Sequence, residues 1–505
     1  MNKPFSALLF LVMFWVVQVE QTASSLLHQK LYEFQTKLQH KKTTSSSIYA
    51  MPSPSLLLPN SIKSSGRVFY PIGYGADPSG AQDSSDAIMN ALGDAFLQVQ
   101  SGLELLPGIK DLGGVVIDFQ GGNYSISNPI RFPSGVGNVL IQGGTLRASN
   151  TFPGDRHLIE LWAPNSQPLN NTTSSDPLSG QENQNYGIYY EDITFRDILF
   201  DSSFRGGGLL VIDSARIRIN NCFFLHFTTE GILVERGHET FISSCFLGQH
   251  STIGGDKEER DFSGTGIILA SNDNAITDVV IFSAATGIIL KGQANMVTGV
   301  HCYNKATYFG GVGILVQAAQ TRIDNCYLDF NAIVIEDPSQ VHVSNGFFLG
   351  DGNIVLKSIK GQISGLTIVN NMFCGAPQNM VPIVKLEGQF TSIDQVVIDH
   401  NNVNGMSLKS TVAKLAVAGN GTRWVADFSS VLVFPNRINH VQYSFYFSPG
   451  FVGFPGHGVT NVSSNVVVVE SDKAVDGVVF MEVDQYNMVG EINFLMRSRE
   501  IVQFH

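Results

Sequence analysis

The chain has 505 residues, a formal net charge of −12 and a charged fraction of only 15%. It contains 50 glycines but only three tryptophans, a composition that favours a β-rich protein with many turns. No polybasic run is present, which argues against nucleic-acid partners and against anionic membrane surfaces. A polyanionic substrate is compatible with the net charge, because local basic residues can offset it where the substrate binds.

The N-terminal stretch MNKPFSALLFLVMFWVVQVEQTASS has one early lysine, an apolar run and small residues near Ala23. This pattern predicts a secretory signal peptide over residues 1–25, followed by a leader over residues 26–65. An uncleaved membrane anchor is the alternative, although the apolar run is short for a spanning helix. We therefore expect a secreted protein with no membrane attachment after cleavage. Five Asn-x-Ser/Thr sequons agree with secretion as candidate glycosylation sites: Asn123, Asn170, Asn171, Asn420 and Asn461.

The stretch RVFYPIGYGADPSGAQDSSDAIMNALGDAF predicts a strand, a loop rich in Gly, Asp and Pro, and then an amphipathic helix that starts near Ser84 and Ser85. The repeated segment that follows would leave unpaired strand edges at its open end. A helix placed before it would cover those edges, so we expect an N-terminal capping helix.

A repeat of about 22 residues dominates the middle of the chain. Typical units are RIRINNCFFLHFTTEGILVERG, AITDVVIFSAATGIILKGQA and QTRIDNCYLDFNAIVIEDPS. Each unit reads as a strand, a tight turn with Asn, Ser or Gly, a second apolar strand, and a third strand that opens with Gly-Ile or a variant. Three short strands per unit predict stacked coils. The third strands (GILV, GIIL) are apolar at consecutive positions, so we expect both of their faces to be buried.

Four of the five cysteines share one sequence context, as in NNCFF and DNCYL. We expect Cys222, Cys245, Cys302 and Cys326 to stack at one position along the coils as buried free thiols, with disulfides as the alternative.

The spacing of the Gly-Ile landmarks is regular except between Gly231 and Gly266, where it is much longer. The extra residues include the charged run DKEERD, so one coil carries a charged insertion. A plain solvated excursion is the alternative to a functional loop, although loops on rigid scaffolds are where binding and catalysis concentrate.

Beyond about residue 420 the repeat is lost, and VLVFPNRINHVQYSFYF and NVVVVESDKAVDGVVFMEV predict longer strands. The expected architecture is therefore all-β: a right-handed, single-stranded parallel β-helix over residues 66–420, with an N-terminal capping helix and a C-terminal β extension over residues 421–505.

The stretch FYPIGYGADPSGAQDSSDAIMNA resembles the start of pectin-degrading β-helix proteins, and NNCFF and TTEGI are similar to motifs of polygalacturonases, glycoside hydrolase family 28 in the pectin lyase-like superfamily. ETFISSCFLGQHSTIGGDKEERDFSGTGI and GQANMVTGVHCYNKAT look like the divergent QUARTET-type polygalacturonases of plants. This resemblance covers residue 66 to the C-terminus. It implies hydrolysis of α-1,4-linked galacturonan in the plant cell wall, and a role in the separation of pollen from its tetrad.

The resemblance also implies an inverting reaction that needs no metal and no cofactor, with pectic polysaccharide as the partner. We expect the enzyme to act as a monomer. The sequence departs from the family pattern, however. Glu230 stands in TTEGI where the family has Asn-Thr-Asp-Gly-Ile, residues 264–267 (GTGI) replace Asp-Asp-Cys-Ile, and residues 285–288 (ATGI) replace Gly-His-Gly-Ile. No Arg-Ile-Lys stands at its expected place.

Glycoside hydrolysis requires one carboxylic acid to protonate the leaving oxygen and a carboxylate to activate water or attack carbon. Glu230 matches the family motif. Asp256 and Asp261 in the insertion are candidates to replace the missing pair, and Asp273 follows the third strand of the same coil. The alternatives are a solvated turn residue for Glu230 and an Asx-type turn for Asp273.

Galacturonate carboxylates require cations for binding, and arginine can grip a carboxylate with two hydrogen bonds. For Arg260, pairing with its acidic neighbours is the alternative. The candidate substrate-binding residues lie on the long coil and its successors: His250, Arg260, Lys291, His301 and Lys305.

Two other functions compete with hydrolysis. A pectate or pectin lyase on the same fold would use a base such as Arg260 or Lys291, with calcium held by the acidic insertion. A wall-polysaccharide binder without catalysis is suggested by the missing Asp pair.

Overall fold

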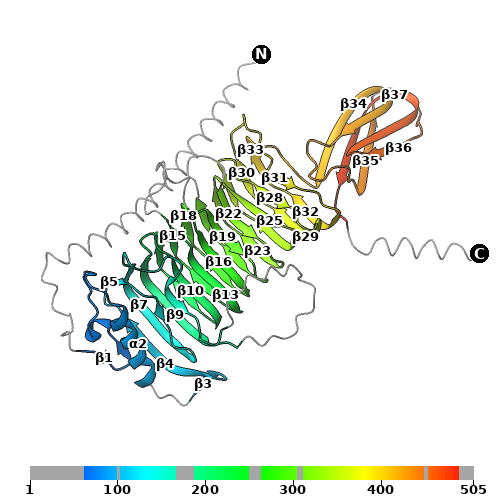
Figure 1. Ribbon diagram of the computed structural model, residues 1–505. Coiled ribbons are helices and arrows are strands. Elements are labelled where there is room, and N and C mark those ends of the chain that lie inside the picture. Colours follow the sequence, from blue (N-terminus) through cyan, green and yellow to red (C-terminus); the bar gives the residue numbers. More distant parts are fainter. Residues whose placement is uncertain are drawn as a thin grey trace, which may run out of the picture. The chain divides into compact units, whose positions relative to one another are not determined.

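The computed structural model describes residues 62–98, 103–166, 187–249, 263–303, 311–448 and 453–487. Contacts from Lys63 onward form one compact unit. Its described strands belong to a 33-stranded sheet system and a separate four-stranded sheet (Figure 1). The prediction of an all-β parallel β-helix is confirmed, because almost every pairing in the larger system is parallel and joins one coil to the next.

The N-terminal part of this unit contains the predicted capping helix. Two short antiparallel strands, β1 (Ser64–Ser65) and β2 (Val68–Phe69), precede the 3₁₀ helix η1 (Pro71–Tyr74) and α2 (Ser85–Gln98). The buried side of α2 carries Ile88, which joins the main core together with residues of the first coils. The first coils are formed by strands β3 (Glu104–Leu106), β4 (Ile109–Asp118), β5 (Asn123–Ile126), β7 (Val136–Ala148) and β9 (Tyr190–Asp201).

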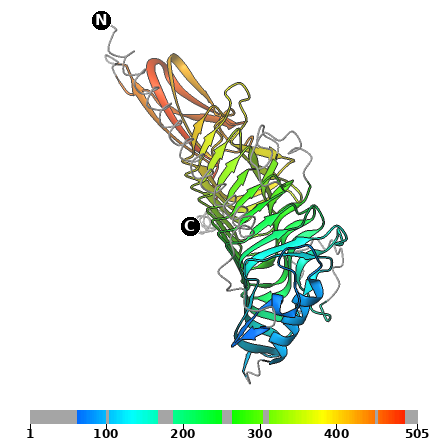
Figure 2. The ribbon, with the colours of Figure 1, turned by 90° about the vertical axis from the view of Figure 1, so that its left-hand side faces the viewer.

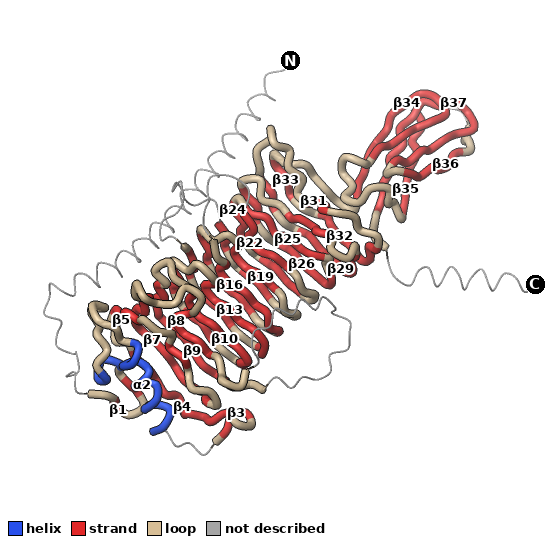
Figure 3. The backbone as a smooth tube through the Cα atoms, viewed as in Figure 1, coloured by secondary structure: helices blue, strands red, loops and turns tan. Residues whose placement is uncertain are grey.

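Three stacks of parallel strands form the coils, and Figures 2 and 3 show the strands side by side along the stack. Sheet 1 consists of β6 (Ile130–Arg131), β8 (His157–Leu161), β10 (Gly207–Ala215), β13 (Glu230–His238), β16 (Thr265–Asn272), β19 (Thr286–Leu290), β22 (Gly311–Val316), β25 (Asn331–Glu336), β28 (Ile354–Lys357) and β31 (Val384–Glu387).

Sheet 2 follows sheet 1 in each coil and begins with β7 and β9. Its shorter strands are β11 (Arg218–Asn220), β14 (Phe241–Ser243), β17 (Ala275–Thr277), β20 (Met296–Thr298), β23 (Thr321–Asp324), β26 (Ser339–Ser344), β29 (Gln362–Val369) and β32 (Ser392–Asp399).

Sheet 3 closes each coil. It consists of β12 (Phe223–Leu225), β15 (Phe246–Gly248), β18 (Val280–Phe282), β21 (His301–Tyr303), β24 (Tyr327–Asp329), β27 (Phe347–Leu349), β30 (Met372–Cys374) and β33 (Asn402–Asn404).

The Gly-Ile landmarks have a simple physical reason. Ile232, Ile267 and Ile288 are in register on neighbouring coils and are fully buried in the core. The glycine before each isoleucine lies against the next coil: a Cβ on Gly231 or Gly266 would stand 2.7 Å from a backbone carbonyl oxygen of that coil. A side chain at this position would therefore push the coils apart, and only glycine fits.

The cysteines are free, as predicted, and four of them are buried. Cys222, Cys245 and Cys326 do occupy one equivalent position, where the backbone oxygen accepts a hydrogen bond from the next strand of sheet 3. The expected position of Cys302 is wrong, because Val300 takes that place and Cys302 lies two residues later, pointing into the core from sheet 3. A small apolar side chain fits both inward positions, so the sequence context shared by the four cysteines did not distinguish one position from the other.

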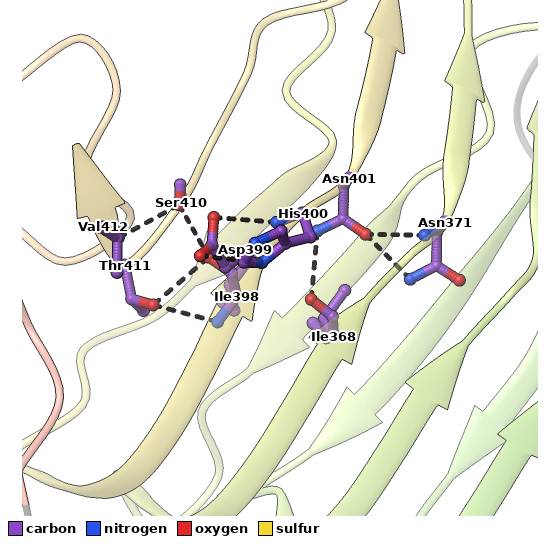
Figure 4. A network of polar contacts seen from close by, with 9 residues as sticks. All are labelled: Ile368, Asn371, Ile398, Asp399, His400, Asn401, Ser410, Thr411 and Val412. Atoms are coloured by element: carbon purple, nitrogen blue, oxygen red, sulfur yellow. Dashed lines mark hydrogen bonds and ion pairs between the residues drawn. The ribbon is translucent and has the colours of Figure 1, made fainter. Parts of the chain in front are cut away.

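Buried and half-buried asparagines bind the backbone at the tight turns. The side-chain oxygen of Asn401 accepts hydrogen bonds from both the backbone and the side-chain nitrogen of Asn371, each at 3.0 Å, and Asn401 Nδ2 donates to the Ile368 oxygen (Figure 4). Asn274 and Asn295 repeat this contact at 2.9 Å between sheets 1 and 2. Each ladder satisfies backbone groups that would otherwise be buried without a partner.

The last described coil is tied to the chain that leaves it. The Ile398 oxygen accepts hydrogen bonds from the Thr411 nitrogen and from Ser410 Oγ, both at 2.8 Å (Figure 4). An antiparallel four-stranded sheet follows, and it starts at Val412, ahead of the expected residue 421. Its strands are β34 (Val412–Asp427), β35 (His440–Phe447), β36 (His457–Ser463) and β37 (Val466–Asp484). Within the described ranges, no helix is both long enough and apolar enough to cross a membrane.

Candidate active site

The outer side of sheet 1 carries the polar side chains that merit attention. From Ile232 onward, alternate residues of β13 enter the core (Ile232, Val234) or stand on the outer side (Leu233, Glu235). Glu230 precedes this alternation, because a Cβ on Gly231 would also meet core side chains. The strand register aligns the positions of Glu230, Leu233 and Glu235 in three rows across the coils. The first row contains His157, Gly207, Glu230, Thr265 and Thr286; the second contains Glu160, Leu210, Leu233, Ile268 and Ile289; the third contains Ile212, Glu235, Ala270 and then Lys291, which directly follows β19.

The first row holds a charged contact. Glu230 Oε2 lies 3.3 Å from Nε2 of the buried His157. Burial acts to raise the pKa of Glu230, but the contact with His157 and its charge act in the opposite direction, supported by Thr229 and Lys291. The net result is a pKa below the ordinary glutamate value, so Glu230 stays ionised in mildly acidic medium.

The third row holds a carboxyl group in a different environment. Burial raises the pKa of Glu235, opposed by the positive charges of Arg236 and Lys291 and reinforced by Glu230 and Asp213. Arg236 does not neutralise it, because Asp213 accepts hydrogen bonds from Arg236 Nε at 2.7 Å and from Nη2 at 3.0 Å. Among the described residues, none forms a hydrogen bond or an ion pair with the Glu235 carboxylate.

An apolar strip separates the two carboxyl groups. It lies outside the main core and keeps the outer side of sheet 1 poor in water, as the apolar third strands predicted. Its members are Leu210, Ile212, Leu233 and Ile268, packed against Trp162 and Ile289.

Two arginines and a tryptophan flank this surface on its N-terminal side. Glu160 is fully buried, and it accepts hydrogen bonds from Arg131 Nε at 3.2 Å and from Arg156 Nε at 2.7 Å. Both guanidinium groups also lie near the ring of Trp162, with Arg131 5.0 Å from its centroid. A basic, aromatic environment of this kind suits an acidic sugar, whose ring can stack and whose carboxylate can bind arginine.

Among the site residues predicted from the sequence, Glu230 and Lys291 lie near each other, whereas Asp273 and His301 lie elsewhere. Lys291 is exposed, and its charge acts on both Glu230 and Glu235. Asp273, in contrast, lies in the turn after β16, whereas Thr265, the strand partner of Glu230, begins that strand. Asp273 has a left-handed backbone (φ 58°) and an exposed side chain, so it is a turn residue remote from Glu230.

His301 also lies away from this surface. It belongs to β21 in sheet 3, and its Nε2 atom is buried without a hydrogen-bond partner. Burial lowers the pKa of His301 to about 4, so its imidazole is uncharged at neutral pH. A neutral ring on another sheet cannot act as the cation that was expected here.

Several predicted residues lie outside the described residues. The chain around the charged insertion is nevertheless described up to Gln249 and from Ser263, just before Thr265, which pairs with Glu230. The described chain therefore resumes after the insertion next to the first row. The predicted residues outside the described ranges are His250, Asp256, Arg260, Asp261 and Lys305, together with the sequons at Asn170 and Asn171.

Of the other sequons, Asn420 and Asn461 are exposed in the C-terminal sheet, and Asn123 is half-buried in β5. Exposed asparagines on strands accept a glycan more readily than a half-buried one, so Asn420 and Asn461 are the better candidates.

Sequence reasoning missed His157, Glu160, Trp162 and Glu235. The last could have been found, because Glu235 is the one ionisable residue at an outward position inside the apolar run GILVE. His157 could not, because its partner Glu230 is distant in the chain and only the stacking of coils brings them together. Within the described ranges, no group of three or more His, Cys, Asp or Glu side chains is placed to hold a metal ion.

Comparison with known proteins gives one informative relative. The chain is 51% identical over 427 residues to Polygalacturonase QRT3 of Arabidopsis thaliana, and the alignment covers 83% of this chain and 84% of that protein. No protein-family model matches the chain.

Similar solved structures are more distant. ORF18 of Geobacillus virus E2 is 11% identical with a TM-score of 0.48, covering 84% of this chain and 79% of that chain. An endo-xylogalacturonan hydrolase from Aspergillus tubingensis is 12% identical with a TM-score of 0.42, covering 67% of this chain and 92% of that chain. At these TM-scores the similarity carries no functional information.

Proposed function

Since the chain belongs to the polygalacturonase family, we propose that it is a glycoside hydrolase that cleaves α-1,4-linked galacturonan in pectic polysaccharide. The family relationship carries this proposal, because 51% identity extends over most of both chains. A substrate of this kind also agrees with the surface chemistry of sheet 1, where carboxyl groups stand near Lys291 and near two arginines that lie over the ring of Trp162.

The proposed substrate-binding surface is the outer side of sheet 1, from the Trp162 region across β10 and β13 to Lys291. Glu230 serves as one catalytic carboxylate, because its low pKa keeps it ionised and able to accept a proton from water. Lys291 binds a galacturonate carboxylate. Asp256 and Asp261 remain sequence-based candidates for the second carboxyl group, supported by the return of their insertion next to Glu230.

The site of action is proposed to be the cell wall after secretion. The sequence supports this with its predicted signal peptide over residues 1–25 and with the sequons, of which Asn420 and Asn461 are exposed. The role in the separation of pollen from its tetrad stays a prediction from the family resemblance.

The test is incubation of the purified protein with polygalacturonate, followed by two readouts. A hydrolase generates new reducing ends without ultraviolet absorption, whereas a lyase generates unsaturated products that absorb. A binder generates neither and only retains the polysaccharide. Loss of reducing ends in Glu230→Gln, with unchanged secretion and thermal unfolding, would tie hydrolysis to sheet 1.

A further inference from the structure

We infer that Glu235 is the second carboxyl group of the hydrolytic site: it donates the proton to the departing glycosidic oxygen, while Glu230 activates the attacking water. This inference rests on the proposed function and assigns its two chemical roles. Neither the family motif nor the sequence analysis points to Glu235.

The geometry places both groups on strand β13 within reach of each other's charge. Glu230 begins the strand, and Glu235 lies five residues further along it, on the outer side with Leu233. The negative charge of Glu230 acts on Glu235. Lys291 lies on the third row two coils further along, and its charge acts on both. The two carboxyl groups and the lysine therefore share one electrostatic environment, which a single acidic sugar chain can contact.

The environments of the two groups differ in the direction that catalysis requires. Glu230 faces His157, Thr229 and Lys291, which keep it ionised against the effect of burial. Glu235 faces Arg236, Lys291, Glu230 and Asp213, and the effect of burial prevails, which favours its protonated form. Paired carboxyl groups whose pKa values are pushed apart in this way are typical of a general base and a general acid.

Glu235 is also free to act. Arg236 is bound bidentately by Asp213, and no described residue occupies the Glu235 carboxyl group with a hydrogen bond. A buried structural glutamate is instead satisfied by partners, as the fully buried Glu160 is by two arginines, whereas the half-buried Glu235 carboxyl group has none among the described residues.

Glu235 gives its proton to the glycosidic oxygen as the bond from that oxygen to the anomeric carbon breaks. Water attacks the anomeric carbon, and Glu230 takes one of its protons. The products are two shorter galacturonans, with Glu235 ionised and Glu230 protonated, and exchange with solvent restores the starting states. No oxidant, reductant or metal takes part.

The decisive experiment compares two substrates in Glu235→Gln. Oligogalacturonosyl fluoride has a leaving group that needs no protonation, whereas polygalacturonate does. We expect Glu235→Gln to lose about 10²–10⁴-fold in kcat on polygalacturonate and to retain most of its activity on the fluoride. Glu230→Gln should lose activity on both substrates. A suitable control is Glu336→Gln, which removes a carboxyl group at the end of β25 that is already paired with Lys357.

The outcomes separate the inference from the proposed function. If the unmodified protein hydrolyses neither substrate, the proposed function fails. If it hydrolyses both and Glu235→Gln does so equally well, or loses both activities alike, Glu235 is not the acid and the inference alone fails. Glu235→Asp keeps a carboxyl group and is the second variant, should the glutamine variant not fold: it should retain partial activity on polygalacturonate.

Discussion

The contact between Glu230 and His157 reaches across an intervening coil. Glu230 Oε2 lies 3.3 Å from His157 Nε2, yet the two residues belong to β13 and β8, with β10 between them. The residue of β10 at this place is Gly207, and a Cβ on it would stand 2.4 Å from the His157 ring. The absence of a side chain at Gly207 therefore lets the ring reach Glu230.

The first prediction concerns the pH dependence of activity. Because His157 holds the pKa of Glu230 below its ordinary value, His157→Gln should raise that pKa and move the acidic limb of the kcat/KM profile to higher pH. Each unit of movement lowers kcat/KM in that limb by about tenfold. The profile is measured on polygalacturonate, with His440→Gln on the exposed edge of the C-terminal sheet as the control. An unmoved acidic limb in His157→Gln would show that the contact does not tune Glu230.

Gly207 provides a second prediction. An alanine here would collide with the His157 ring and with the Glu230 carbonyl oxygen, which lies 2.5 Å from the added carbon. Gly207→Ala should therefore destabilise the fold by about 1–3 kcal/mol and shift the acidic limb in the same direction as His157→Gln. Denaturant unfolding measures the first effect. Gly154→Ala, where the added carbon meets nothing within 4 Å, should change neither quantity, and equal effects of both alanines would exclude the steric explanation.

Most of the fold could be predicted from the sequence, because the same sequence pattern recurs in each coil. Gly231 and Ile232 mark a place where a backbone must approach closely and an aliphatic side chain must enter the core, and this pair recurs in the next coils. The position of Cys302 could not be predicted in this way. The sequence context that it shares with Cys222 fits two neighbouring inward positions of a coil, and only the strand pairing in the structure distinguishes them.

The candidate site was harder to predict, since it depends on which residues meet across coils. Glu230 was found through a motif. His157, which lowers the pKa of Glu230, lies two strands away in the stack. Glu235 differs from an ordinary exposed glutamate only in its burial and in the pairing of the neighbouring Arg236 with Asp213. Asp273 was predicted because it directly follows β16 in the sequence. It lies after the C-terminal end of that strand, whereas Glu230 pairs with Thr265 at the N-terminal end.

Lys291 is expected to bind the substrate by charge. It is exposed, and within the described part of the chain it forms no ion pair, so its charge is available to a galacturonate carboxylate. Lys291→Ala should raise KM for polygalacturonate by about tenfold with a smaller change in kcat, and added salt should raise KM less in the variant than in the unmodified protein. Lys357→Ala is the matched control, because Lys357 already pairs with Glu336 at 2.9 Å. An equal rise of KM in both variants would point to a general loss of positive charge.

The last prediction concerns stability and comes from Asp329, away from sheet 1. Asp329 ends β24 in sheet 3, and burial raises its pKa to about 6. No described residue gives its carboxyl group a hydrogen bond. Since its pKa in the folded state exceeds the unfolded value, the protonated group contributes stability at pH below about 4, and that contribution is lost as the pH rises through about 6.

Asp329→Asn keeps the shape and cannot ionise, so it should raise the free energy of unfolding by about 2–3 kcal/mol at pH 7 and have little effect at pH 4. Asp324→Asn should do the reverse, because Ser344 and Asn345 hold the pKa of Asp324 below its ordinary value, and its stabilising charge is present at neutral pH and lost on acidification. Urea unfolding at both pH values measures the two variants. The two aspartates end consecutive strands of one coil, β23 and β24. A general effect of removing a negative charge would shift both in the same direction, whereas burial and hydrogen bonding require opposite signs.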